Sequence, residues 1–346
     1  MKFLITGLGS IGQRHVRNLR RVLGPNAEIG AYRVRKRDVV IDPGLTAKTG
    51  ESPEAYYGLR TFSSLEEALA DRPDAVFVTN PIAFHMETAL AAAREGCHLF
   101  IEKPLSDRWQ GVDELRHLVA EKHLVVCAGY NLRFHPALKL MRQALRENRI
   151  GRICSAQIHV GEYLPGMHPY EDYRDSHAAR RREGGGVILC LSHEIDYACW
   201  LFGIPTRVFS VGGHLTGMEL DVEDTAGVLC EFKIAGRSVP VQLHLDFVQR
   251  PPSRSCKIVG ETGTIVWDYY GQSFSLYDAS RGDWTKQTFE AFDRNTMFID
   301  ELTNFLKAIE GGPPEFASLD EGASALRVAL AARSSLEERR IVELTA

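Results

Sequence analysis

Short apolar runs alternate with stretches of helical periodicity through the first third of the chain. The runs that predict buried strands span residues 2–6, 27–32, 75–79, 98–101 and 124–128. Between them, apolar residues recur every three to four positions, which predicts helices over 13–19, 65–69, 85–95 and 109–121. This alternation is typical of an α/β fold in which helices cover both faces of a doubly wound parallel sheet.

The pattern changes after about residue 130. A helix is predicted over 136–147, and strand-like runs then recur between turn residues at 153–160, 206–212, 226–233, 238–248, 256–259 and 263–269. This spacing predicts an α+β unit with a large, mostly antiparallel open sheet, covered on one face by helices near 187–202, 295–310 and 320–335. We therefore predict two domains, residues 1–130 and residues 131–346.

The composition narrows the classes of function. The 346 residues carry 45 acidic and 41 basic side chains, whereas nucleic-acid-binding domains are usually basic. No window approaches the ~20 consecutive apolar residues of a membrane-spanning helix, and no signal-peptide core is found. The seven cysteines are scattered, which favours buried thiols over disulfides or a metal site. We expect a cytoplasmic protein that binds a small molecule and has no metal, nucleic-acid or membrane partner.

A glycine-rich turn follows the first predicted strand. Gly7, Gly9 and Gly12 have Gly-x-Gly-x-x-Gly spacing where the first helix begins. In a dinucleotide-binding Rossmann domain, these glycines allow the tight turn, the approach of the pyrophosphate and close helix packing. Ser10 and Ile11 lie in the first helical turn, where free backbone N–H groups attract phosphate. We expect a nicotinamide dinucleotide here; a plain strand–turn–helix corner is the alternative.

The end of the second strand predicts which dinucleotide binds. NAD enzymes usually place Asp or Glu there for the ribose hydroxyls, but this chain has Arg33, followed by Lys36 and Arg37. An arginine fork can bind a 2′-phosphate, which a carboxylate would repel. NADP(H) is therefore favoured over NAD(H), with Arg33 as the main contact and Arg37 or Lys36 as helpers. A solvated basic loop is the alternative.

Further motifs follow in a defined order along the chain. They are Thr79-Asn80-Pro81 with His85, Glu102-Lys103-Pro104, Gly129-Tyr130-Asn131-Leu132-Arg133-Phe134-His135-Pro136, Gly184-Gly185-Gly186, and His193-Glu194-Ile195-Asp196. Together with the glycine turn, they resemble the glucose-fructose oxidoreductase / inositol dehydrogenase (Gfo/Idh/MocA) family over nearly the whole chain. The resemblance implies an NAD(P)-dependent oxidoreductase with a Rossmann domain and a second domain for substrate binding and oligomerisation.

Lys103 and His193 are the expected catalytic residues. Lys103 follows a predicted buried strand, and the carboxyl ends of such strands face the ligand crevice. In similar proteins this lysine contacts the substrate hydroxyl and the nicotinamide ribose. A histidine titrates near neutrality, and the resemblance implies that His193 takes the alcohol proton as hydride leaves. A surface lysine and a core histidine are the alternatives.

One position departs from the family pattern. Many similar proteins carry an aspartate shortly before the histidine, where this chain has Cys190. Cysteine is neither ionised by default nor a strong acceptor. The role of the aspartate is therefore absent or filled by Glu194 or Asp196. Asp196 lies one helical turn beyond His193, and we expect it to contact the substrate.

The resemblance also implies contacts along the cofactor. The positions expected to provide them are Asn80, Pro81, His85, Glu102, Lys103, Asn131 and Arg133. Asn131 and Arg133 are expected to reach the crevice from the domain junction, Arg133 also on the substrate side. His135 and Pro136 are expected to shape the turn into the next helix.

Residues 161–183 lack apolar periodicity and are dense in tyrosine, histidine, arginine and carboxylate side chains. Aromatic faces stack on the C–H surfaces of sugars, and charged groups bind their hydroxyls. We expect substrate contacts from Tyr163, His168, Tyr173 and Arg174. The arginines would also suit an anionic or nucleotide-linked sugar. A structural meander that seals the sheet edge is the alternative.

Three functions fit these residues. The leading one is hydride transfer between nicotinamide C4 and a hydroxyl-bearing carbon of a sugar or sugar derivative. The second is a redox-neutral hydrolase or lyase, because some similar proteins oxidise their sugar only transiently. The third is a non-catalytic NADP(H) sensor. An exposed apolar sheet face is costly, so the apolar alternation in 238–248 also predicts a homodimer or homotetramer.

Overall fold

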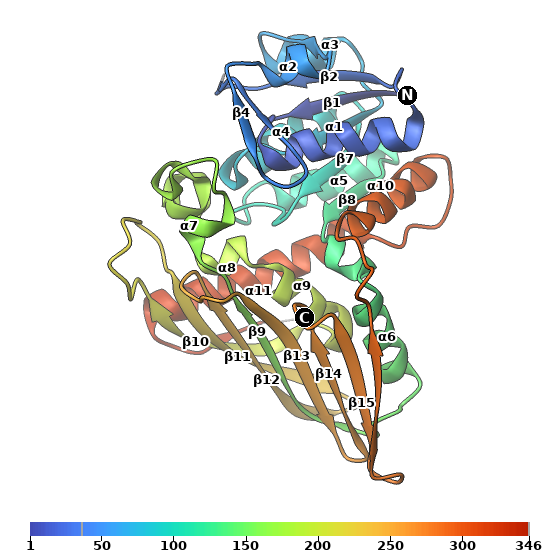
Figure 1. Ribbon diagram of the computed structural model, residues 1–346, viewed down its shortest axis with the longest axis vertical. Helices are drawn as coiled ribbons and strands as arrows, with labels where there is room; N and C mark the ends of the chain where they lie inside the picture. Colours follow the sequence, from blue (N-terminus) through green and yellow to red (C-terminus); the bar gives the residue numbers. More distant parts are fainter. Residues whose placement is uncertain (36, 345–346) are drawn as a thin grey trace.

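The first domain is built on a seven-stranded sheet in the computed structural model, which describes residues 1–35 and 37–344 (Figure 1). The strand order is β17-β8-β7-β6-β1-β2-β5, and β17 runs antiparallel to β8 while the others are parallel. The strands are β1 Lys2–Thr6, β2 Glu28–Tyr32, β5 Arg60–Thr61, β6 Ala75–Val78, β7 His98–Glu102, β8 Val126–Gly129 and β17 Ala317–Ser318. Strands β6 and β7 are almost wholly buried, which explains their continuous apolar runs.

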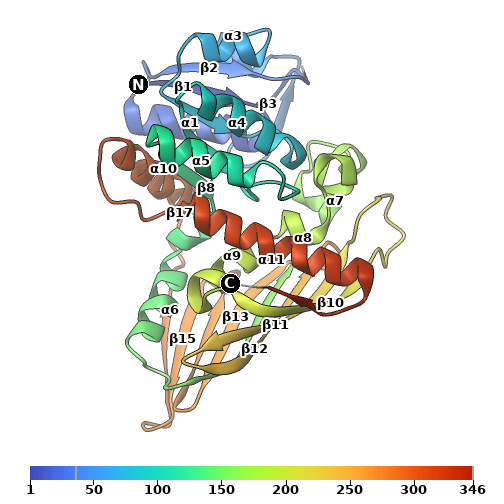
Figure 2. The same cartoon turned by 180° about the vertical axis from the view of Figure 1, so that it is seen from behind.

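Helices cover both faces of this sheet. Figure 1 shows α1 and α10 in front of it, and Figure 2 shows α4 and α5 on the opposite side. The helices are α1 Ser10–Leu23, α2 Pro53–Tyr56, α3 Leu65–Ala70, α4 His85–Arg94, α5 Val112–Lys122 and α10 Asn295–Ile309, and a small hairpin pairs β3 Val39–Ile41 with β4 Ala47–Thr49. The predicted doubly wound parallel sheet is confirmed.

A segment from far along the chain completes the first domain. Helix α10 packs on α1, where Arg14 Nη1 donates to Asn295 Oδ1 at 2.9 Å. The Phe305 ring lies 5.9 Å from the ring of Phe77 and 5.5 Å from that of Phe100. The predicted division at residue 130 therefore describes the chain as far as β8, but residues 295–318 return to the first sheet.

The second sheet has nine strands in the order β16-β15-β14-β13-β9-β12-β11-β10-β18. All neighbours are antiparallel except β9 and β12. The strands are β9 Ile153–Gly161, β10 Pro205–Gly213, β11 Thr225–Ile234, β12 Arg237–Asp246, β13 Ser253–Gly260, β14 Gly263–Asp268, β15 Ser273–Asp278, β16 Asp283–Thr288 and β18 Val342–Glu343. The predicted large, mostly antiparallel sheet is confirmed.

One face of the second sheet is covered and the other is open (Figure 2). Helices α6 Pro136–Arg146, α8 Val187–Cys190, α9 His193–Phe202 and α11 Leu319–Glu338 pack on the covered face. His135 caps α6, because its Nδ1 accepts from the N–H of Ala137, and Pro136 is the first helical residue, as predicted. Strand β12 alternates buried and exposed side chains, as a sheet with one covered face requires.

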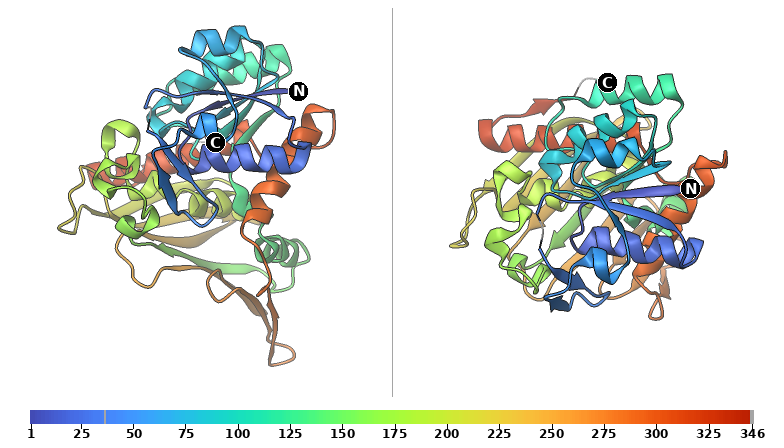
Figure 3. Two further views of the ribbon diagram at one scale, coloured as in Figure 1. Left: turned by 45° about the horizontal axis from the view of Figure 1, so that its top comes forward. Right: turned by 90° about the horizontal axis from the view of Figure 1, so that it is seen from above.

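The helix predicted over 187–202 is two helices, α8 and α9, divided at Leu191 and Ser192. The break leaves the Cys190 carbonyl free to bind a side chain from the first domain. The preceding segment, 162–186, contains short helical pieces and lies between the two domains (Figure 3). These pieces are α7 Leu164–Met167, η3 Tyr173–Asp175, η4 His177–Ala179 and η5 Arg181–Glu183. Within the described residues, no helix is long and apolar enough to cross a membrane.

Candidate active site

The glycine turn between β1 and α1 is tight for steric reasons at two of its three glycines. Gly7 has φ +130°, and a Cβ there would lie 2.9 Å from the Thr79 carbonyl oxygen. A Cβ on Gly12 would lie 1.9 Å from the Gly7 carbonyl oxygen. A Cβ on Gly9 would meet no atom within 4 Å. The turn is therefore closed on the protein side and open beside Gly9.

This turn fits the pyrophosphate of a dinucleotide. Helix α1 has no side-chain cap, so the N–H groups of Ser10, Ile11 and Gly12 have no partner inside the helix. These N–H groups and the helix dipole favour an anion beside Gly9. The turn therefore holds five of the expected cofactor residues, which are Gly7, Gly9, Ser10, Ile11 and Gly12.

Each arginine after β2 has a carboxylate partner. Arg33 binds Glu54 through both arms of its fork, at 2.5 Å from Nε and 2.7 Å from Nη2, and its Nη1 donates to the Arg37 carbonyl. Arg35 pairs with Glu183, and Arg37 Nη1 lies 3.0 Å from Glu171 Oε2. The expectation that Arg33 is free for a 2′-phosphate disagrees with this geometry. Lys36 lies outside the described residues.

The loop after β6 is tied to the loop after β7 by a buried histidine. The ring nitrogens of His85 lie 2.8 Å from the Asn80 carbonyl oxygen and 2.9 Å from the Pro104 carbonyl oxygen. His85 therefore positions the two loops, and its expected contact with the cofactor stays a prediction. The Asn80 Nδ2 donates to Thr88, while its Oδ1 is buried and has no hydrogen-bond partner among the described residues. Pro81 starts the short helix η1 (Ile82–Phe84) at this edge.

Lys103 reaches from the end of β7 to the break between α8 and α9. Its Nζ donates to the carbonyl oxygen of Cys190 at 2.5 Å. Burial raises the pKa of the Cys190 thiol to about 12, so this side chain stays neutral and cannot replace an aspartate. The backbone of Cys190, and not its side chain, holds the lysine.

His193 begins α9, three residues after that carbonyl. Its ring packs edge-on against Tyr130, with centroids 5.7 Å apart, and its Nδ1 is buried without a hydrogen-bond partner in the described chain. Burial, then the charges of Lys103, Arg254 and Arg294, lower the pKa of His193 well below its ordinary value. The imidazole is therefore neutral at physiological pH and able to accept a proton.

Glu102 points into the first domain. Its Oε1 accepts a hydrogen bond from His15 Nε2 at 2.8 Å. The His15 ring packs against both Phe77 and Phe100, with centroids at 5.1 and 4.8 Å. The Glu102 carboxylate therefore joins α1 to β7, and its expected contact with the cofactor stays a prediction.

Arg133 and Asp196 form a buried ion pair. Arg133 donates from Nε and Nη2 to the two Asp196 oxygens, at 2.9 and 2.7 Å, and from Nη1 to Glu321 at 2.6 Å. Both partners of the pair have side chains only 2% exposed. Each side chain is thus occupied by the other, and the expected contacts of Arg133 and Asp196 with cofactor or substrate stay predictions. Asn131 is buried beside them in η2 (Asn131–Phe134).

The segment between the domains divides the predicted substrate residues into two groups. Arg174 binds Asp172 and Glu219, and the Tyr173 hydroxyl accepts from the Glu219 N–H. These contacts hold the exposed loop after β10, and the expected substrate contacts of Tyr173 and Arg174 stay predictions.

The other group consists of Tyr163 and His168, which make different contacts. Tyr163 packs under the Arg250 guanidinium at 4.0 Å, and His168 Nδ1 lies 3.5 Å from Glu171. His177 was missed by sequence analysis, because nothing separates it from the other polar residues of this segment. Burial, then His168 and Lys103, lower its pKa to about 3. His177 is therefore a neutral group beside Lys103.

A second cluster lies next to His193 in the chain, and of its members sequence analysis named only Glu194. Arg254 Nε is 3.0 Å from Glu194 Oε1, and its Nη2 is 3.6 Å from Glu162 Oε1. The Glu194 side chain is 0% exposed. Burial raises the pKa of Glu194 to about 7; Arg254 opposes the shift and Glu162 adds to it. Glu194 is thus a carboxyl group that titrates near neutral pH next to His193.

The Glu194 carboxyl group makes the free energy of unfolding fall as pH rises. Its pKa is about 7 in the folded chain and near 4.5 when unfolded, so its contribution is complete below pH 4.5 and is lost as pH rises through 7. We expect Glu194→Gln to gain about 2 kcal/mol relative to the unmodified chain between pH 5 and pH 8. Urea unfolding at both pH values measures this difference. Parallel pH profiles of the two proteins would contradict it.

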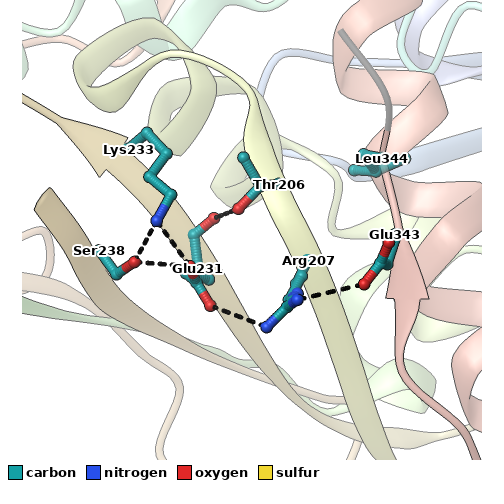
Figure 4. Close-up of a pocket in the computed structure, with 7 residues that line it drawn as sticks. All are labelled: Thr206, Arg207, Glu231, Lys233, Ser238, Glu343 and Leu344. Atoms are coloured by element: carbon teal, nitrogen blue, oxygen red, sulfur yellow. Dashed lines mark hydrogen bonds and ion pairs between the residues drawn. The ribbon is translucent and has the colours of Figure 1, made fainter. Parts of the chain in front are cut away.

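A surface hollow at the far edge of the second sheet contains none of the candidate catalytic residues (Figure 4). Its charged side chains are paired with one another: Arg207 with Glu231 and Glu343, and Lys233 with Glu231. The remaining lining residues are Thr206, Ser238 and Leu344. It contains neither Lys103 nor His193, so it is separate from the candidate active site.

The glycine turn and Lys103 thus lie at the carboxyl edge of the first sheet, where Lys103 contacts the second domain next to His193. Residues 1–130 match the family model described as oxidoreductase family, NAD-binding Rossmann fold, and residues 138–266 match the GFO/IDH/MocA C-terminal domain. The chain belongs to the Gfo/Idh/MocA family of sugar dehydrogenases and reductases.

Named relatives and solved structures match the whole chain. Myo-inositol 2-dehydrogenase of Thermotoga maritima is 27% identical over 356 residues, covering 99% of this chain and 98% of the relative. The WlbA dehydrogenase from Bordetella pertussis, solved with NADH and UDP-GlcNAcA, has a TM-score of 0.78 at 22% identity and covers 100% and 99% of the two chains. Levoglucosan dehydrogenase, solved with NADH and levoglucosan, has a TM-score of 0.80 at 21% identity and covers 100% of both.

Proposed function

We propose that the protein transfers hydride between nicotinamide C4 and a hydroxyl-bearing carbon of a sugar or cyclitol. The observation that carries this proposal is the contact of Lys103 Nζ with the Cys190 carbonyl, because it fixes the lysine three residues from His193. The relatives named above act on an inositol, a nucleotide sugar or an anhydrosugar. They support a polyhydroxyl substrate.

The protein's own residues then handle the proton. Bound nicotinamide supplies the hydride acceptor or donor. Lys103 Nζ donates a hydrogen bond to the substrate oxygen and orients the reacting carbon. Neutral His193 takes the hydroxyl proton as the C–H bond breaks, and returns it in the opposite direction.

We propose NAD(H) as the cofactor. The Arg33 side chain is 9% exposed, and Glu54 occupies its fork. A 2′-phosphate would have to displace that carboxylate or lie against it, and either event costs affinity. The ribose hydroxyls of NAD(H) need no such exchange.

We propose an uncharged substrate in place of the anionic sugar that the arginine-rich segment favoured. The guanidinium groups of this segment are taken by carboxylates: Arg174 by Asp172, Arg180 by Asp175 and Arg181 by Glu337. An anionic group would compete with these carboxylates. The expected cytoplasmic location stays a prediction.

The test is an incubation with NAD+ and NADP+ in parallel, using pooled cyclitols, sugars, sugar acids and nucleotide sugars. We expect one neutral polyol to lose two hydrogens with matching reduction of NAD+, read by mass spectrometry and absorbance. Cleavage of a glycoside without net reduction would assign the redox-neutral class instead. Binding of cofactor without hydride exchange on any member of the pool would favour the sensor.

The open face of the second sheet is proposed to contact a second copy of the chain. Phe209 lies directly opposite Leu229 on adjacent strands, and Val211 extends the same exposed apolar patch. Light scattering after gel filtration should give the mass of two or four chains. Leu229→Glu should lower that mass to one chain because the substitution places like charges in the interface. Lys122→Glu, on helix α5 of the first domain, is the control and should leave the mass unchanged.

A further inference from the structure

The loop after β2 is held by carboxylates from the other domain. Arg37 lies 3.0 Å from Glu171, and Arg35 pairs with Glu183. Both glutamates belong to the segment that runs between the domains and carries α7 (Figures 1 and 3). The substrate domain therefore neutralises arginines of the loop that, in a Rossmann domain, reads the adenosine ribose.

Glu171 is held as an anion at this contact. Burial opposes its ionisation, but the hydrogen bond and charge of His168, together with Arg37, keep the pKa of Glu171 below its usual value. Its side chain is largely enclosed, whereas that of Arg37 is about half exposed. A full negative charge therefore stands at the loop at neutral pH.

Independent contacts place Glu171 beside the cofactor turn. The side chain of the preceding residue, Tyr170, lies near the side chain of Ser10 in the first turn of α1. The far end of the segment packs on η1 of the first domain, where a Cβ on Gly184 would lie 2.7 Å from the Ile82 Cβ. The segment thus approaches the first domain at two places, near the glycine turn and at η1.

We propose that Glu171 is a specificity-determining residue that selects NAD(H) over NADP(H) from the substrate domain. This inference rests on the proposed function as a nicotinamide oxidoreductase. Glu54 and Glu171 act on the same loop, Glu54 from within the first domain and Glu171 across the crevice. The arginines that suggest an NADP enzyme in the sequence are thereby unavailable in the fold.

The preference for NAD(H) over NADP(H) follows from the charges of the 2′-phosphate and of Glu171. A 2′-phosphate carries about −1.5 to −2 charges at pH 7, so it competes with Glu171 for Arg37 and is repelled by the carboxylate. The ribose 2′-hydroxyl of NAD(H) is neutral and does neither. Removing the charge of Glu171 should therefore change the affinity for one cofactor and not for the other.

The test is Glu171→Gln, with dissociation constants for NADH and NADPH measured by nucleotide fluorescence without any sugar. We expect NADPH to bind about 10-fold more tightly to the variant, while NADH affinity changes less than about 2-fold. Arg37→Ala in the Glu171→Gln background should remove the gain. Glu219→Gln removes the same charge from a carboxylate that pairs with Arg174, and should leave both constants unchanged.

Two outcomes would overturn the proposal. One is an unchanged NADPH constant in Glu171→Gln, and the other is an equal gain for both cofactors, which would indicate general electrostatics. Because the measurement needs no substrate, it is separate from the proposed activity. Failure to bind either nucleotide would reject the proposed function, whereas tight NADH binding with no change of selectivity would reject only the role of Glu171.

Discussion

Lys103→Ala should lower turnover by about three orders of magnitude and leave NADH binding nearly intact. The side chain leaves the end of β7 and is fixed by the Cys190 carbonyl, so its ammonium group stands beside His193. Its removal takes away the donor to the substrate oxygen without opening the phosphate turn. Steady-state rates with the substrate found above, and NADH fluorescence titration, measure the two effects.

One control variant and one further catalytic variant accompany this experiment. Lys122→Ala changes an exposed lysine at the end of α5 and should be silent. His193→Ala should lower turnover by about 100-fold, also with cofactor binding retained, because it removes the proton acceptor. If Lys103→Ala lost NADH binding in proportion to its activity, the lysine would be a cofactor anchor instead of a catalytic group.

Asp196→Ala should lower the free energy of unfolding by about 3–5 kcal/mol. Arg133 gives Asp196 two hydrogen bonds in a buried pair, and the substitution leaves a guanidinium without its main partner. Glu321 alone cannot replace both bonds, since it already accepts at Arg133 Nη1. Urea unfolding followed by circular dichroism gives the value.

The double variant Arg133→Met/Asp196→Leu tests the reason for that loss. Replacing both charges with apolar side chains removes the unpaired cation, so most of the lost stability should return. If the double variant were as unstable as Asp196→Ala, packing rather than charge would explain the effect. Asp113→Ala, in an exposed ion pair with Arg116, should cost less than about 1 kcal/mol.

The main layers of the fold could be predicted because their strands are buried and regular. Strand β6 is apolar throughout, β7 has three buried apolar residues between His98 and Glu102, and β12 alternates exposed and buried side chains from Ser238 to Leu245. Strand β16 was missed because all six of its side chains are exposed, so no alternation marks it. Strand β17 has two residues and takes its place only by pairing with β8, which no local pattern encodes.

Only part of the candidate site could be predicted, because local motifs are visible in the sequence and distant partners are not. The glycine turn, Lys103 and His193 belong to local motifs, and the structure brings them to one crevice. The partners of Arg33, Arg37 and Arg133 lie 21, 134 and 63 residues away in the sequence. An unpartnered arginine and a neutralised one look alike in sequence, so the preference for NADP(H) and the substrate role of Arg133 could not be checked there.

The return of residues 295–318 to the first sheet has a consequence for synthesis on the ribosome. Phe305 covers Phe77 and Phe100, and β17 covers the edge of β8, so a nascent chain of 130 residues exposes an apolar face and an unpaired strand edge. At about 5–20 residues per second, synthesis of residues 131–318 takes about 10–40 s. During that interval the first domain lacks α10 and β17. Its apolar face and the edge of β8 therefore stay accessible to nascent-chain chaperones.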